Sequence, residues 1–135
     1  MSTELSTAAT HIYSKITGDA TLAAAVGNRV YEDAAPSKTV YPCIVFSCIT
    51  PNDSVSVGGV TIKSDLDYTI KVVGQNSSYA LIDPVAARLK AVLHHSESGN
   101  VLSCIREKPF NRSYELNGVQ YHERGGIYRI MIQGA

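Results

Sequence analysis

TLAAAVGNRVY, residues Thr21–Tyr31, joins a helical turn of small residues to a short strand, and Gly27 separates the two. After a polar loop the chain continues as YPCIVF, residues Tyr41–Phe46. Pro42 has no amide donor and therefore fits the start of a strand. We expect this strand to cover Cys43–Ile49. Because it is apolar on both faces, other parts of the protein should cover both faces.

Hydrophobic spacing places the elements on either side of this stretch. A first helix is expected over about Thr3–Thr17, where apolar residues recur at helical spacing, and it ends at Gly18. Asp65–Val73 alternates between apolar and polar residues, which is typical of a strand. Its apolar residues, all on one face, are Leu66, Tyr68, Ile70 and Val72.

A long helix is expected to end near His95, and Pro84 allows two interpretations of its start. Either Asp83 caps a helix that begins at Pro84, or Pro84 lies in an early turn of a longer helix. The C-terminal third reads as strands joined by a two-residue turn at Asn117-Gly118. The expected strands, the first of them ended by Pro109, are 101–107, 113–116, 119–124 and 127–132.

This order of elements predicts one α+β domain over residues 1–135. Two helices should pack on one face of a mostly antiparallel β-sheet, with a long hairpin arm at about 51–64. Pro51-Asn52-Asp53-Ser54 is expected to break the preceding strand. The other sheet face should be polar or meet a partner, and four tyrosines are candidates for it: Tyr68, Tyr114, Tyr121 and Tyr128.

Composition excludes several classes of protein. Lys plus Arg number 12 and Asp plus Glu number 12, so the net charge is zero, which argues against a protein that wraps nucleic acid. Weak net repulsion also favours self-association. The start has no signal-peptide pattern and no run is apolar enough to cross a membrane, so we expect synthesis in a cytoplasm. The three cysteines should be reduced, buried thiols.

The candidate chemical sites have simpler structural explanations. A metal site at His94-His95 would need His11, His122 or a carboxylate nearby, and a favourable helix C-terminus explains the pair better. Asp65 and Asp67 share one strand face, which we interpret as a solvated face.

Two further patterns also lack the features of a site. Gly58-Gly59 followed by Lys63-Ser64 lacks phosphate-loop spacing and a following helix. The basic residues Arg106, Lys108 and Arg112 fit an interface or a solvated rim better than a nucleic-acid site.

The order of motifs resembles one family. It runs from Asp19–Tyr31 through Ala35-Pro36 and Tyr41–Phe46 to the alternating strand Leu66–Val73 and a helix ending Ala91-Val92-Leu93. This order is similar to that of the tail-completion proteins of tailed bacteriophages and prophages, also called tail terminators or head–tail joining proteins. The resemblance covers roughly Thr3 to His95, with a weaker match in the final hairpin.

The resemblance implies a structural protein of the virion tail or neck, assembled in the bacterial host cytoplasm, with no catalysis, no cofactor and no metal. Its members form a ring, usually six-fold, that caps the tail tube and stops tail elongation. The implied partners are further copies of the chain, the tail tube protein and the head connector or stopper protein. DNA would pass through the channel without sequence-specific binding, and no membrane is involved.

Within that framework the arm is the expected contact element. Small polar residues and glycines there are typical of a segment that orders on a partner. The expected inter-subunit or tube-facing residues are Asn52, Asp53, Ser54, Gly58, Gly59 and Lys63.

Two alternatives stay open at this point. The chain could be another phage neck protein, such as a head-completion or stopper subunit. It could instead be a small metal-dependent hydrolase that uses His94, His95 and His122.

Overall fold

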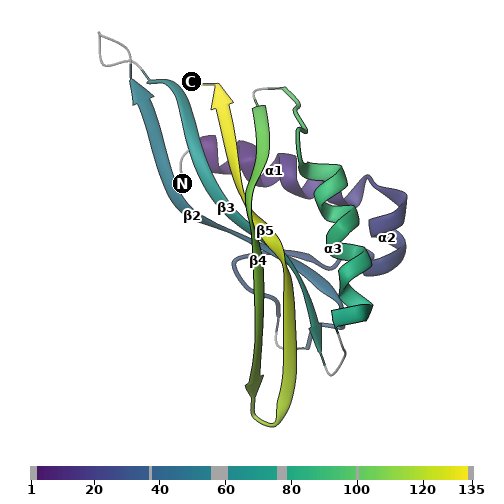
Figure 1. The fold of residues 1–135 in the computed structure, drawn as a ribbon. Coiled ribbons are helices and arrows are strands. Elements are labelled where there is room, and N and C mark those ends of the chain that lie inside the picture. The colour runs from purple at the N-terminus through teal and green to yellow at the C-terminus, as the bar shows by residue number, and fades with distance from the viewer. Residues whose placement is uncertain (1–2, 37, 56–60, 76–78, 100, 134–135) are drawn as a thin grey trace.

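The computed structural model describes residues 3–36, 38–55, 61–75, 79–99 and 101–133. Within them the strands form one five-stranded sheet in the order β1-β2-β3-β5-β4, antiparallel except for the β1–β2 pair. The helices lie over one face of this sheet (Figure 1), so the predicted α+β fold is confirmed. The elements are α1 (Thr3–Thr17), α2 (Ala20–Val26), β1 (Val30–Glu32), β2 (Cys43–Val55), β3 (Thr61–Gln75), α3 (Tyr79–Leu93), β4 (Val101–Leu116) and β5 (Val119–Gln133).

The stretch around Gly27 sets the entry into the sheet. Asp19 caps α2 by accepting a hydrogen bond from the Leu22 amide at 3.0 Å, and Gly27 ends the helix with φ 60°. The Arg29 Nε then donates to the Pro42 carbonyl at 3.2 Å. This bond ties the turn to the start of β2, where β1 pairs in parallel.

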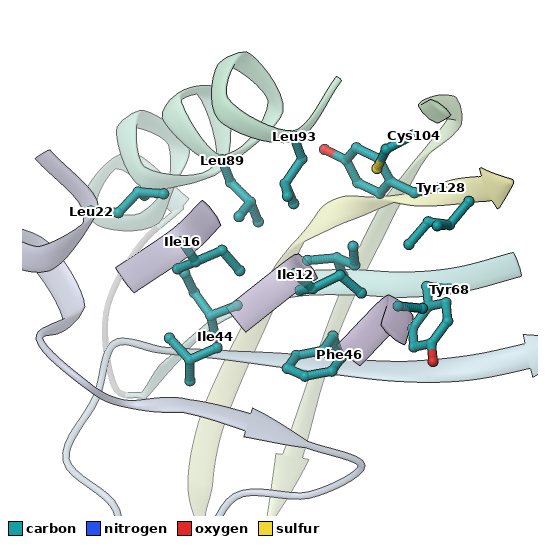
Figure 2. Packing of buried hydrophobic residues seen from close by; sticks show 14 of the residues in the cluster. Ile12, Ile16, Leu22, Ile44, Phe46, Tyr68, Leu89, Leu93, Cys104 and Tyr128 are labelled. Atoms are coloured by element: carbon teal, nitrogen blue, oxygen red, sulfur yellow. The ribbon is translucent and has the colours of Figure 1, made fainter. Parts of the chain in front are cut away.

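The main core lies between the helices and the sheet (Figure 2). Ile12 and Ile16 of α1 and Leu89 of α3 are fully buried against it. The predicted inward face of β3 is confirmed, but two of the tyrosines expected on the outer face are in this core. Tyr68 is 0% exposed and Tyr128 is 1% exposed, because the helices cover the face on which they lie.

Two prolines expected to end strands lie inside them. β2 continues through Pro51 to Val55, and β4 continues through Pro109 to Leu116. The physical reason is that both prolines lie on a free edge, where no ladder partner needs the missing amide. β1 pairs only with Ile44–Phe46, and β4 is the outermost strand. The strands expected at 101–107 and 113–116 are therefore one, and 119–124 and 127–132 likewise merge into β5.

The long helix α3 begins at Tyr79, so Pro84 lies inside it and Asp83 is not its cap. Its buried residues are Ile82, Leu89 and Leu93. None of the helices in the described ranges has the length and apolar character that crossing a membrane requires.

On the second face of the sheet, the described buried side chains gather at one end. A small cluster there contains Cys43, Val45 and Val73, against which Tyr41 and Tyr121 pack. Tyr114 stacks on Tyr121, with ring centroids 5.3 Å apart. These two tyrosines, unlike Tyr68 and Tyr128, do lie on the face away from the helices. The β2–β3 and β4–β5 hairpins extend toward opposite ends of the sheet (Figure 1).

Candidate functional site

The predicted contact arm corresponds to the β2–β3 hairpin. Its described backbone pairs with β3 in an antiparallel ladder, with a register shift between Ser54 and Val55. Asn52 pairs with Asp65, Asp53 with Ser64, and Ser54 with Lys63. The expected break at 51–54 is therefore wrong, because the ladder to β3 supports the strand on one side even where its other edge is free. Gly58 and Gly59 lie outside the described residues.

The β4–β5 hairpin is a second projecting element, which the sequence indicated only by its turn. Asn117 and Gly118 have φ values of 53° and 79°, so the predicted two-residue turn is confirmed. Most of β4 near this turn is exposed, and Leu116 at the tip is 58% exposed. A hairpin that buries so little in its own subunit is available for contact with another molecule.

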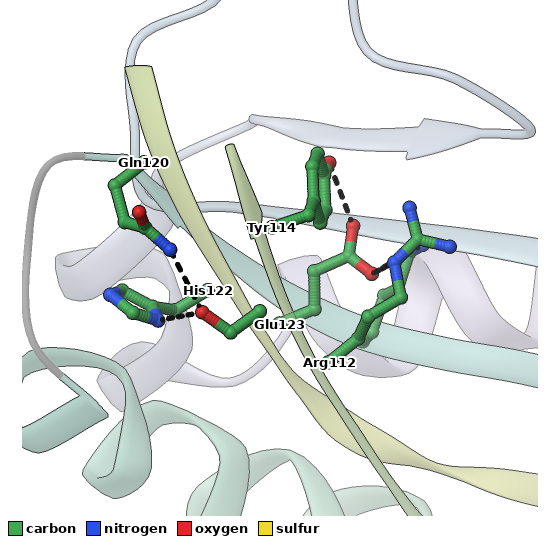
Figure 3. A network of polar contacts seen from close by, with 7 residues as sticks. Arg112, Tyr114, Gln120, His122 and Glu123 are labelled. Carbon is green, nitrogen blue, oxygen red and sulfur yellow. Dashed lines mark hydrogen bonds and ion pairs between the residues drawn. The ribbon is translucent and has the colours of Figure 1, made fainter. Parts of the chain in front are cut away.

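A polar cluster ties the base of this hairpin to β3 (Figure 3). The buried Glu123 carboxylate lies 3.1 Å from Lys71 Nζ and 3.5 Å from Arg112 Nε, and it accepts a hydrogen bond from the Tyr114 hydroxyl at 3.2 Å. The cluster lines a cleft of about 240 Å³ beneath the loop at 33–42.

Chemically, this cluster is structural. The Cys43 thiol in the same cleft has its pKa raised to about 11, chiefly by burial, with Glu123 adding to the effect. It therefore stays protonated at neutral pH and is a poor nucleophile. No local sequence pattern indicates this cluster, because the pairing of β3 with β5 brings Lys71 and Glu123 together.

The three basic residues predicted as a group do not form one patch. Arg106 lies on the helical side, where its guanidinium donates to the Gly125 carbonyl at 3.0 Å. Arg112 lies in the Glu123 cluster on the opposite face, and Lys108 is exposed between them on the edge strand.

His122 lies apart from His94 and His95, whose ring centroids are 4.0 Å from each other. His94 accepts a hydrogen bond from the Arg106 amide at 2.9 Å, whereas His122 contacts Ser113 at 3.0 Å and packs on Tyr79. Among the described residues, no group of His, Cys, Asp and Glu side chains has the arrangement needed to hold a metal ion.

His11 was considered only as a possible metal ligand and has a different role. It is 3% exposed, with ring nitrogens 2.6 Å from Ser98 Oγ and 2.9 Å from Ser96 Oγ. Ser96 in turn donates to the Leu93 carbonyl at 2.6 Å. His11 thus links α1 to the loop after α3, and burial lowers its pKa, with Lys15 adding to the effect.

Comparisons with known proteins show what the chain is similar to. The chain resembles a solved chain from a structure described as the virion of a native gene transfer agent particle. The TM-score is 0.67 and the identity 21%, over 91% of this chain and 92% of that one, which shows a shared fold. Among curated proteins, none matches significantly. A family model described as Tail completion protein gp17 matches residues 10–107, well over half of the chain. The protein therefore belongs to the tail completion protein gp17 family, a family of structural virion tail proteins rather than enzymes.

Proposed function

We propose that this tail completion protein forms a closed ring, with six subunits, on the end of the tail tube. The ring stops tail elongation and joins the tail to the head connector. The observation that carries the proposal is the family match over residues 10–107. The fold supports it, because one compact body presents two different hairpins at opposite ends (Figure 1).

A protein that stops the growth of a tube needs two different binding surfaces. A tube elongates when each added ring offers the next ring the same binding surface. A protein that ends the process must match the tube on one side and present a different surface on the other. The β2–β3 and β4–β5 hairpins differ in sequence, so the two ends of this subunit are not equivalent.

The β2–β3 hairpin remains the proposed inter-subunit or tube-facing element. Its contact residues are Asn52, Asp53, Ser54, Gly58, Gly59 and Lys63. Opposite charges such as Asp53 and Lys63 would pair with neighbouring molecules, each exposed pair contributing up to about 1 kcal/mol. Residues 1–135 act as a single domain, and DNA passes through the ring channel without sequence-specific contacts. The zero net charge supports that last point.

Removing the gene from its phage or prophage tests the proposal. We expect tails longer than normal and without heads, measured by negative-stain electron microscopy. Tails of normal length would overturn it. Labelling the protein in intact particles adds a second result: a ring at the tube end supports tail termination, whereas a ring on the portal side would show a head-completion or stopper subunit.

A further inference from the structure

A basic groove lies on the helical side of the sheet, between α3 and the edge strand β4. It has a volume of about 280 Å³ and three cationic side chains, from Lys90, Arg106 and Arg124. Arg124 is paired with Asp83 at 2.8 Å, but in the described part of the chain no carboxylate forms an ion pair with Lys90 or Arg106. The other lining residues are Ala86, Ala87, Pro109, Phe110, Asn111 and Gly125.

Contacts with β5 place the Arg106 side chain in this groove. The Arg106 side chain lies over Gly126, where an added Cβ would be 2.5 Å from its Nε, and it donates to the Gly125 carbonyl. The neighbouring His94 has its pKa lowered by desolvation, then by His95, Lys90 and Arg106. The groove is therefore a site of positive potential that would accept a carboxylate.

An acidic groove lies at the other edge, between α1 and β1. Its volume is about 340 Å³, and Glu32 is its one charged lining residue. Glu32 is exposed and forms no ion pair with the residues that the structure describes. Beside it, Tyr13 is 38% exposed and offers a ring that can pack against a cation. The remaining lining residues are Ala9, Thr10, Ser14, Val30 and Phe46.

The two grooves are placed for contact between copies of the chain. β1 and β4 are the outermost strands of the sheet, so the acidic and basic grooves lie at opposite edges, both on the helical side. Although the net charge of the chain is zero, the two edges of the sheet therefore carry charges of opposite sign. Two basic grooves would repel each other across a two-fold axis, and so would two acidic grooves. The basic groove of one copy instead matches the acidic groove of a second copy.

We infer that the α3–β4 groove of one copy binds the α1–β1 groove of the next, with Lys90 and Arg106 facing Glu32 and the ring of Tyr13. This inference rests on the proposed ring and names the contact that closes it. Each subunit uses both edges, so the contact is head-to-tail. In a closed ring, every Glu32 and every Lys90 lies at a contact between subunits. An open chain leaves one groove without a partner at each end.

Charge reversal in the purified full-length protein tests this contact. Lys90 and Glu32 are both exposed, so Lys90→Glu and Glu32→Lys should leave the fold intact, which circular dichroism checks. Each single variant should raise the dissociation constant between subunits about tenfold, measured by analytical ultracentrifugation in low salt. The control, Glu115→Lys, reverses an exposed charge outside both grooves and should associate like the wild type.

Mixing the two single variants gives the sharpest result. The α3–β4 groove of the Lys90→Glu variant keeps Arg106 but gains a carboxylate, which can pair with the α1–β1 groove of the Glu32→Lys variant, now basic. The remaining contact between the two variants is the native pair, so the mixture should associate more tightly than either variant alone. A mixture that associates no more tightly than the single variants, or a wild-type protein that is monomeric in low salt, would overturn the inference.

Binding of DNA in the α3–β4 groove is the competing outcome. In that case Lys90→Glu will weaken binding of a labelled duplex and leave the assembly mass unchanged, which also overturns the inference. Failure of the mixing experiment together with overlong tails in the gene deletion would reject this contact but not the proposed function.

Discussion

Lys71 Nζ lies 3.1 Å from Glu123 Oε1, although the two residues are 52 positions apart in the chain. The Glu123 side chain is 3% exposed and the Lys71 side chain 20%, so water screens this ion pair only weakly. The pair connects β3 to the base of the β4–β5 hairpin. Together with the β3–β5 ladder and the packing of Tyr121, this pair holds the orientation of the hairpin.

Glu123→Ala should therefore destabilise the protein. The substitution leaves the Lys71 ammonium and the Tyr114 hydroxyl without their shared acceptor, and removing one member of a buried pair costs about 3 kcal/mol. The free energy of unfolding in urea measures this effect. Glu115→Ala, at an exposed position of the same hairpin, should change stability by less than about 0.5 kcal/mol. Equal stability of the two variants would contradict a structural role for Glu123.

His11 should make stability depend on pH. Because burial and Lys15 lower its pKa in the folded protein, the unfolded chain binds a proton more readily. Stability is then full above the ordinary histidine value of about 6.5, and it declines as pH falls below that value toward the lowered folded pKa. The reference pKa values of Asp and Glu are about 4, so thermal melts between about pH 7.5 and 5.5 report mainly on histidine.

The variant His11→Gln should flatten this decline while being less stable at neutral pH, because it loses contacts to Ser96 and Ser98. Some slope should remain, since desolvation also lowers the pKa of His94. A decline of unchanged steepness would assign the effect to another group.

Tyr68→Phe should not destabilise the protein, in spite of the complete burial of Tyr68. Within the described residues its hydroxyl has no hydrogen-bond partner, and burial raises its pKa. Replacing an unsatisfied hydroxyl by hydrogen removes a desolvation cost, so we expect stability equal to the wild type or about 1 kcal/mol higher. Tyr114→Phe is the matched comparison: it loses the bond to Glu123 and should lose about 1 kcal/mol. A clear loss in Tyr68→Phe would show a partner for this hydroxyl.

The contrast between α1 and β4 shows which features the sequence could predict. The bounds of α1 agree with prediction because its apolar stripe and Gly18 are local signals. The length of β4 was missed because Pro109 breaks a strand only where its amide is needed, and that depends on β4 being outermost. Tyr68 and Tyr128 were misplaced for a related reason. Alternation tells which residues share a face, but not which face the helices cover.

The candidate contact surfaces also differ in whether local sequence patterns or the arrangement of strands determines them. The β2–β3 hairpin could be located from its glycines and alternating flanks, which are short-range patterns. The Glu123 cluster could not, because the register of β3 against β5 brings Lys71 to Glu123. The opposite charges of the two edge grooves likewise depend on strand order, which no local pattern contains.

Gly125→Ala should be the most damaging small substitution in the sheet. An added Cβ would lie 2.1 Å from the Ile70 carbonyl oxygen and 2.6 Å from Lys71 Cα, so β5 would have to move away from β3. The backbone of a paired strand cannot move aside as a side chain can. We therefore expect the free energy of unfolding in urea to fall by about 3 kcal/mol or more. Gly126→Ala is the matched control, because its Cβ would meet the flexible Arg106 side chain, which can shift. That variant should lose only about 1 kcal/mol. If both variants unfold at the same urea concentration, the close approach of β3 and β5 at Gly125 does not limit stability.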